Sequence, residues 1–273
     1  MTTASTTEAD SLYNDLEKKS VKEILLCIHN EDKKIVPAVF EVLPQIEKLV
    51  EQVYLRMKKG GRLFYIGSGT SGRLGILDAS EIPPTFGVSH DLVIALIAGG
   101  DSAIREAVEM AEDDELQGWK DLEKYDATPL DTIVGIAASG RTPYVIGAVK
   151  KAGTEGLLTA CIVNNKGSLL SQSVDIAIEA IVGPEFVTGS TRMKSGTSQK
   201  LILNMITTSL MIKLGRVKGN KMVNMQLTNQ KLINRGTRMI MAELGYDEAK
   251  AKRLLLLHGS VNAVLMSEKE EKL

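Results

Sequence analysis

The residues that decide the fold read Gly61-Arg-Leu-Phe-Tyr-Ile-Gly-Ser-Gly-Thr-Ser-Gly-Arg-Leu-Gly-Ile-Leu-Asp-Ala-Ser-Glu-Ile-Pro-Pro84. A short apolar run at 62–66 is followed by a glycine-rich loop at 67–72 and then by a helical pattern. This order predicts a β-strand, a loop at its carboxyl end and a helix. Glycines let the backbone approach a ligand, and the first amides of the helix present the positive end of its dipole. We therefore expect a phosphate-type anion at this loop, held by Ser68, Gly69, Thr70 and Ser71.

The same loop also fits G-x-G-x-x-G, the fingerprint of dinucleotide-binding domains. A dinucleotide site requires an acidic residue at the end of the second strand to hold a ribose. That strand is expected to end at Ile97-Ala-Gly-Gly100, with Asp101 beyond it. A phosphate is favoured over a dinucleotide, and a purely structural turn is the third interpretation.

Composition argues against several classes of protein. The 273 residues carry a formal net charge of -1 and only 4% aromatic side chains, so we expect neither nucleic acid nor a membrane surface as partner. The two cysteines, Cys27 and Cys161, match no metal or redox spacing. The amino-terminal residues lack a leader pattern, and no apolar run reaches membrane-spanning length. We expect a cytoplasmic protein.

Strand and helix patterns alternate after a helical amino-terminal part. We expect one helix from a capping box at Ser20 to about residue 30 and another over about 34–58. Alternation predicts a five-stranded, doubly wound parallel sheet with the flavodoxin-like order 2-1-3-4-5. The expected strands are 62–66, 92–98, 132–138, 158–163 and 175–181. We expect three parts, which are an amino-terminal helical segment at 1–57, the sheet domain at 58–219 and a carboxyl-terminal helical region at 220–273.

Two further loops carry hydroxyl groups and cations. Ala138-Ser-Gly-Arg-Thr-Pro143 follows the third strand, which neighbours the first in the expected order. Ser139, Gly140, Arg141 and Thr142 should therefore lie beside the first loop. A third set precedes a long apolar helix that ends near 214, and it contains Thr188, Ser190, Thr191, Arg192 and Lys194. Taken alone, each loop is more simply a capped helix start.

These strings carry a family resemblance. Gly67-Ser-Gly-Thr-Ser-Gly-Arg73 and residues 138–143 together resemble a sugar isomerase (SIS) domain. The longer strings at 74–88, 97–100 and 188–197 resemble the N-acetylmuramic acid 6-phosphate etherases. The resemblance runs from about Ser20 to Asn229. It implies a homodimeric lyase without a cofactor or metal, which cleaves the lactyl ether of a sugar phosphate in cell-wall sugar recycling. It also implies a carboxyl-terminal helical region that is short for the family.

The resemblance also implies two catalytic glutamates. Glu81 matches the acid that protonates the leaving lactate and then activates water, and Glu112 matches the base that removes the C2 proton. From the residues alone, Glu81 is an ordinary solvated group, and Glu112 shares a charged helical face with Glu109. Glu185 resembles a catalytic glutamate of related isomerases and is expected to bind the sugar.

Alternatives and one assembly expectation remain. A non-catalytic sugar-phosphate sensor or an aldose–ketose isomerase would use the same crevice. The three scattered histidines support neither a catalytic triad nor a metal site. Glu81 lies nine residues beyond Gly72, roughly 13 Å along a continuous helix. We therefore expect Glu81 to serve the ligand of a neighbouring subunit.

Overall fold

The computed structural model describes residues 5–108 and 110–270. The chain forms two compact units. The first comprises Met1–Ala79 and Asp91–Thr208, and the second comprises Ser80–His90 and Ser209–Leu273. The three-part division expected from the sequence stays a prediction.

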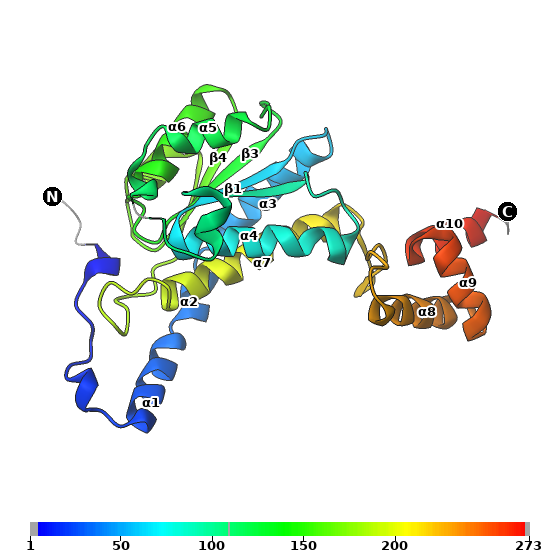
Figure 1. Ribbon diagram of the computed structural model, residues 1–273, viewed down its shortest axis with the longest axis horizontal. Helices are drawn as coiled ribbons and strands as arrows, with labels where there is room; N and C mark the ends of the chain where they lie inside the picture. Colours follow the sequence, from blue (N-terminus) through cyan, green and yellow to red (C-terminus); the bar gives the residue numbers. More distant parts are fainter. Residues whose placement is uncertain (1–4, 109, 271–273) are drawn as a thin grey trace. The chain divides into compact units, whose positions relative to one another are not determined.

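A five-stranded parallel sheet forms the centre of the first unit (Figure 1). Its strands are β1 (Leu63–Gly67), β2 (Val93–Ile97), β3 (Thr132–Ile136), β4 (Leu158–Val163) and β5 (Ile176–Glu179). The order is β2-β1-β3-β4-β5, which confirms the predicted topology. Gly67 pairs with Ile97 on one side and with Ile136 on the other. The carboxyl ends of β1, β2 and β3 are therefore level, and the loops that follow them start side by side.

Helices cover both faces of the sheet because its strands are apolar on both sides. Every residue of β1, β3 and β4 is buried. Phe64 and Ile66 belong to the core beneath α5 (Gln117–Glu123) and α6 (Pro143–Thr154). The opposite face carries Tyr65, against which α4 (Gly69–Phe86) packs so closely that a Cβ on Gly75 would lie 3.2 Å from the Cβ of Tyr65. The long helix α7 (Lys194–Lys213) and α3 (Leu43–Met57) also lie on this side (Figure 1).

The amino-terminal helices differ in one respect from the prediction. The predicted capping box is confirmed at the start of α1 (Val21–Asp32), where Ser20 N–H donates to Glu23 Oε2 at 2.8 Å. The continuous helix predicted over 34–58 is wrong, because the chain forms α2 (Ile35–Phe40) and then α3. Pro44 explains the break. It has no N–H to donate to the carbonyl four residues earlier, and it is tolerated only in the first turn of a helix.

The segment between β2 and β3 also differs from the prediction. A helix carrying Glu112 was expected here, but the structure has two 3₁₀ turns, η3 (Gly100–Ile104) and η4 (Ala111–Asp113), before α5 begins. Met110 adopts a left-handed conformation with φ 59°, which interrupts a helix. Glu112 and Glu115 are three residues apart and would share one face of a continuous helix, where their like charges repel. Glu109 lies outside the described residues.

The second unit has a small helical core of its own. A short hairpin of β6 (Val217–Lys218) and β7 (Lys221–Met222) leads to three helices, α8 (Gln230–Leu244), α9 (Glu248–His258) and α10 (Val261–Glu270). Asn229 and Asp247 cap α8 and α9 with side-chain oxygens. Ile240, Leu255 and Val264 are fully buried between the helices. The predicted helical carboxyl-terminal region is confirmed.

The first unit also contains three short 3₁₀ turns. They are η1 (Thr6–Glu8) and η2 (Leu16–Lys18) near the amino terminus, and η5 (Ser171–Ser173) between β4 and β5.

Candidate functional site

The loop after β1 is as tight as its glycines imply. A Cβ on Gly67 would lie 2.7 Å from the backbone N of Gly72, and a Cβ on Gly72 would lie 2.6 Å from a side-chain carbon of Ile97. Gly69 has φ +49°, a left-handed conformation that favours glycine. A larger side chain at Gly67 or Gly72 would push the loop away from the sheet, whereas at Gly69 it would strain the backbone. The sequence thus fixes the turn that brings the start of α4 to the sheet edge.

The carboxylate of Glu112 contacts the loop after β1. Ser68 Oγ donates a hydrogen bond to Glu112 Oε2 at 3.0 Å, and the Glu112 side chain is exposed. Both residues line a cavity of about 270 Å³ together with Gly69 and Arg73. Arg73 Nε donates to the backbone oxygen of Ile104 at 2.9 Å, which orients its guanidinium group. One cavity therefore offers a hydroxyl, a carboxylate and a cation, which suits a polar anionic ligand.

Ser71 contacts α7 within the fold. It is buried, and its Oγ donates to Gln199 Oε1 at 2.9 Å. Gln199 Nε2 in turn donates to Asn164 Oδ1 at 3.2 Å. Thr70 also faces α7, since a Cβ on Gly196 would lie 3.2 Å from the Thr70 Cγ2. These contacts fix the first turn of α4 against the start of α7, and ligand binding by Thr70 and Ser71 stays a prediction.

A buried carboxylate that the sequence analysis missed ties the same two helices together. Asp78 of α4 accepts hydrogen bonds from Asn204 Nδ2 at 2.9 Å and from Thr207 Oγ1 at 3.2 Å, both on α7. The hydroxyl of Tyr65 approaches the other carboxylate oxygen at 3.4 Å. Burial raises the pKa of Asp78 above its ordinary value, although these hydrogen bonds oppose the shift. Asp78 therefore stabilises the helix pair beneath the first loop.

The loop after β3 lies beside the first loop, as predicted from the strand order. Gly140 has φ +64°, and a Cβ there would lie 2.2 Å from Ser168 Oγ, so only glycine fits. Ser139 Oγ accepts a hydrogen bond from the backbone N–H of Arg141 at 3.2 Å. Thr142 occupies the N-cap position of α6, which begins at Pro143. Two hydroxyl-bearing loops and two helix starts therefore meet at one sheet edge, where parallel sheets bind their ligands.

The third predicted set has a different environment. Glu185 is 1% exposed, and its two carboxylate oxygens accept the backbone N–H groups of Lys194 at 3.0 Å and Ser195 at 2.9 Å. Lys194 was expected to be a cation for the ligand, but it is 1% exposed and its Nζ pairs with Glu31 of α1. Glu185 thus caps α7, and Lys194 holds α1 against the sheet unit. Ser190 is half-buried in the turn before α7. Ligand binding by Glu185, Ser190 and Lys194 stays a prediction.

Burial and hydrogen-bonding partners shift the pKa of Glu31 in opposite directions. Burial favours the protonated carboxyl group, whereas hydrogen bonds from Lys194, from Lys34 at 2.7 Å and from the Tyr13 hydroxyl at 3.1 Å favour the carboxylate. The partners dominate, and the pKa of Glu31 lies below its ordinary value. This group is ionised at neutral pH and is part of a buried charge network.

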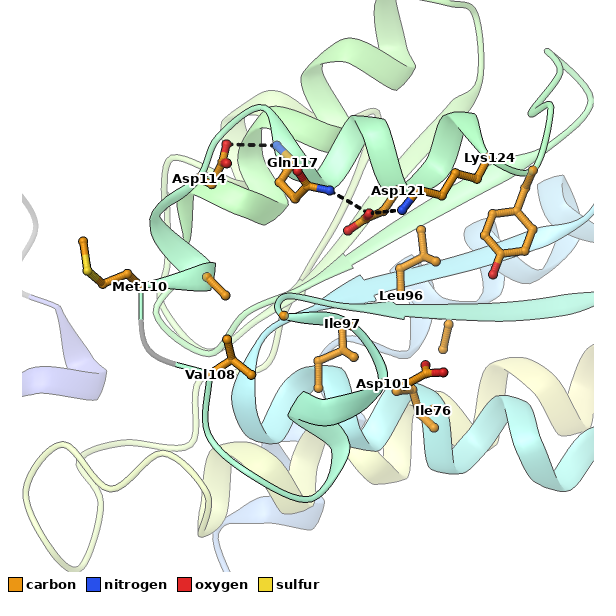
Figure 2. A pocket seen from close by; sticks show the side chains of 15 residues that line it. Ile76, Leu96, Ile97, Asp101, Val108, Met110, Asp114, Gln117, Asp121 and Lys124 are labelled. Atoms are coloured by element: carbon orange, nitrogen blue, oxygen red, sulfur yellow. Dashed lines mark hydrogen bonds and ion pairs between the residues drawn. The ribbon is translucent and has the colours of Figure 1, made fainter.

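A larger cavity of about 670 Å³ adjoins the edge strand β2 (Figure 2). Val108 and Met110 line both this cavity and the smaller one that holds Ser68 and Glu112. Figure 2 shows a polar chain along α5, in which Asp121 Oδ1 accepts Gln117 Nε2 at 2.8 Å and Lys124 Nζ at 2.9 Å. Much of the rest of the wall comes from β2, from the residues just after it at 99–101, and from Ile76 of α4. The string Ile97-Ala-Gly-Gly100 quoted from the sequence and Asp101 beyond it supply part of this lining.

Glu81 belongs to the second unit. It lies in α4, and its side chain is exposed. The helix continues past it to Phe86 with Pro83 and Pro84 inside, so Glu81 is not at a helix end. Pro84 O accepts the backbone N–H of Gln226 at 3.1 Å, which joins this end of α4 to the rest of the second unit. The catalytic role of Glu81 stays a prediction.

Comparisons with known proteins agree with the resemblance. The chain is 63% identical over 258 residues to an N-acetylmuramic acid 6-phosphate etherase of Bacteroides fragilis strain YCH46, covering 94% of this chain and 92% of the relative. It is 60% identical over 265 residues to one from Porphyromonas gingivalis strain ATCC 33277, covering 97% of each chain. The chain belongs to the N-acetylmuramic acid 6-phosphate etherase family. Family models for the glucokinase regulatory protein N-terminal SIS domain and for the SIS domain match residues 45–153 and 107–209 of this etherase-family chain.

Solved structures confirm the fold of this etherase-family chain. A phosphoheptose isomerase from Neisseria gonorrhoeae superposes with a TM-score of 0.54 at 16% identity, covering 70% of this chain and 98% of that one. Within the described ranges no helix is long and apolar enough to cross a membrane. Nor do three His, Cys, Asp or Glu side chains of the described residues gather in a group that could hold a metal ion.

Proposed function

We propose that this protein cleaves the D-lactyl ether of N-acetylmuramic acid 6-phosphate, giving N-acetylglucosamine 6-phosphate and D-lactate. The observation that carries the proposal is the 63% identity, over nearly the whole chain, to a relative named N-acetylmuramic acid 6-phosphate etherase. The level loops after β1 and β3 support it, because they place hydroxyl groups and helix amides at one sheet edge where a sugar phosphate can bind.

The reaction is an elimination followed by addition of water. In the open-chain sugar the C1 aldehyde acidifies the C2 proton, and the ether at C3 lies β to that carbonyl. Loss of the C2 proton first gives an enolate. The enolate then forms the C2–C3 double bond as the C3–O bond breaks and the lactate oxygen takes a proton. Water then adds at C3, and C2 regains a proton. Neither step requires a metal.

Two carboxyl groups can perform these proton transfers. We assign Glu112 as the base for the C2 proton because it lies in the cavity beside Ser68. We assign Glu81 as the acid for the lactate oxygen and then the base for water, by its match to the family motif. Each such transfer contributes about 10²–10⁴-fold to the rate.

The sugar phosphate would contact the two glycine-containing loops. We propose that Ser68, Gly69, Ser139 and Arg141 bind it directly. The predicted set is completed by Thr70, Ser71, Gly140, Thr142, Glu185, Ser190 and Lys194. Of these, Ser71, Glu185 and Lys194 already have buried partners within the fold.

We further propose a cytoplasmic homodimer in which Glu81 serves the ligand of the other subunit. Its distance along α4 from the first loop motivates this. Activity per chain should fall on dilution as the oligomer dissociates. Full activity in a dilute sample that sedimentation shows to be monomeric would contradict the shared site.

The test of the reaction is incubation of the purified protein with N-acetylmuramic acid 6-phosphate in ¹⁸O-water, with mass analysis of both products. Elimination and hydration predict ¹⁸O in N-acetylglucosamine 6-phosphate and none in the released lactate. Label in lactate would indicate that the bond between the ether oxygen and the lactyl carbon breaks instead. Binding of the sugar phosphate without lactate release would favour the sensor.

A further inference from the structure

The segment formed by residues 5–13, here called the N-terminal strap, contacts two of the loops predicted to bind the sugar phosphate. Its first contact is Asn165, two residues beyond β4. The backbone N–H of Thr7 donates to Asn165 Oδ1 at 3.0 Å, and Asn165 Nδ2 donates to Thr7 Oγ1 at 2.8 Å. Thr7 is 1% exposed and Asn165 is 5% exposed. The strap is therefore held by a reciprocal, buried pair of hydrogen bonds.

Asn165 connects the strap to the loop after β3. The same Nδ2 lies 3.1 Å from the backbone oxygen of Ser139 and 2.9 Å from Ser5 Oγ. Ser139 is thus held by Asn165 while the next residue, Gly140, packs against Ser168. Without Thr7, the buried amide of Asn165 would lose partners on both its oxygen and its nitrogen, which is costly for a group away from water. The strap and the conformation of this loop are coupled through one side chain.

The strap also contacts the segment before α7. The backbone N–H of Ser11 donates to Thr188 Oγ1 at 2.9 Å, and Ser11 Oγ donates to the backbone oxygen of Phe186 at 2.7 Å. The rings of Tyr13 and Phe186 pack with centroids 5.2 Å apart. Figure 1 shows the dark-blue amino-terminal segment beside the yellow-green loop that leads into α7. One short stretch of chain therefore spans two predicted binding loops that are about fifty residues apart in sequence.

We propose that Thr7 and Asn165 are positioning residues for sugar-phosphate binding, acting by fixing the loop of Ser139–Thr142. The proposal rests on the function proposed above and deepens it. Neither residue needs to touch the ligand, because both are buried. Productive binding requires the loop groups to be held in one geometry, and loosening that geometry weakens binding first.

The test compares four variants of the full chain for KM, kcat, melting temperature and the Kd of N-acetylglucosamine 6-phosphate measured by calorimetry. Thr7→Val removes the hydroxyl that accepts from Asn165 Nδ2, and Asn165→Asp removes the Nδ2 donor to Thr7 and to Ser139. Both keep the side-chain shape and the bond from the Thr7 N–H, and we expect each to raise KM and Kd about tenfold with a smaller effect on kcat. Thr7→Ser keeps the hydroxyl and should restore values close to wild type. Thr237→Val is the matched control, since Thr237 is a buried threonine like Thr7. Its Oγ1 donates to the backbone oxygen of Ile233 at 2.9 Å, far from the predicted binding loops in sequence. This control should lower the melting temperature without changing KM or Kd.

Two outcomes decide against the proposal. Unchanged KM and Kd in Thr7→Val and Asn165→Asp would overturn the proposal, and so would an equal change in Thr237→Val, which would reveal only a general loss of stability. If Thr7→Val does not fold, Ser5→Ala removes a half-buried acceptor of the same Asn165 Nδ2, and it should raise KM about threefold. A wild-type protein that releases no lactate refutes the proposed reaction, but the Kd series still tests the strap.

Discussion

Two regions predicted to meet the ligand differ in what their charged side chains already contact. Beside β1, the exposed carboxylate of Glu112 accepts a bond from Ser68 and lines an open cavity. Before α7, Glu185 and Lys194 are both buried, one capping a helix and the other paired with Glu31. A ligand can replace the first contact at little cost, whereas breaking the second leaves a buried charge without its partner. The first region is therefore suited to contact a ligand, whereas the second contributes to the stability of the fold.

The largest expected effect is on turnover, from Glu112→Gln and Glu81→Gln. Each variant loses one proton-transfer group, so kcat should fall about 10²–10⁴-fold. Both side chains are exposed, so the melting temperature should stay within experimental error of wild type. Steady-state lactate release and thermal denaturation measure the two quantities. Normal turnover in the Glu112→Gln variant would contradict a catalytic role for the region beside β1.

The second expected effect is on stability, from Lys194→Met. The variant keeps much of the apolar stem but leaves Glu31 buried with one cationic partner fewer, so unfolding free energy should fall by about 3 kcal/mol. Urea denaturation at pH 7 measures it. Lys18→Met is the control, because Lys18 forms an exposed pair with Asp15 and should change stability by less than about 1 kcal/mol. Equal effects of the two variants would contradict the distinction between buried and exposed charges.

The same network predicts a pH dependence. The pKa of Glu31 is lower in the folded chain than its ordinary value of 4.5, so folding is favoured by its ionised form. Its stabilisation is fully present above about pH 4.5 and is lost as the pH falls through the lower folded value. The difference in melting temperature between wild type and Glu31→Gln should therefore shrink as the pH is lowered from 6 to 3. A difference that is constant over this range would show that Glu31 is not held ionised by its partners.

The smallest expected effect comes from Ser68→Ala. It removes one neutral donor to an exposed carboxylate, so KM should rise about threefold and stability should barely change. Ser102→Ala is a suitable control, because Ser102 Oγ donates to the backbone oxygen of Gly99 in the neighbouring 3₁₀ turn. Equal KM changes in both variants would indicate a general effect on the cavity wall.

The sheet and its glycine loops could be predicted because their signals are local. Buried parallel strands read as short apolar runs, and the glycines at 67, 69, 72 and 140 each meet a backbone demand visible in the structure. The motif strings likewise led to the family. The break before Pro44 also has a local signal, because a proline in the middle of the expected helix over 34–58 is tolerated only where a new helix begins.

Side-chain partners distant in sequence could not be predicted in this way. Lys194 looked like a free cation because its partner Glu31 lies 163 residues away, and no periodicity reports such a pair. The link from Thr7 through Asn165 to Ser139 is equally invisible, since each residue alone resembles an ordinary loop polar group. The turns around Met110 depend on the competition between helix formation and acidic repulsion, which pattern analysis resolves poorly.

The most direct test of the central claim is proton exchange at C2 of N-acetylmuramic acid 6-phosphate in D₂O, followed by mass spectrometry or NMR for wild type and both glutamate variants. The account predicts that Glu112→Gln shows neither exchange nor lactate release, because it lacks the C2 base. Glu81→Gln should still exchange the C2 proton of unreacted substrate while releasing little lactate, because only the leaving oxygen lacks its acid. Exchange that persists in Glu112→Gln and disappears in Glu81→Gln would contradict the assignment of the base to the cavity beside β1.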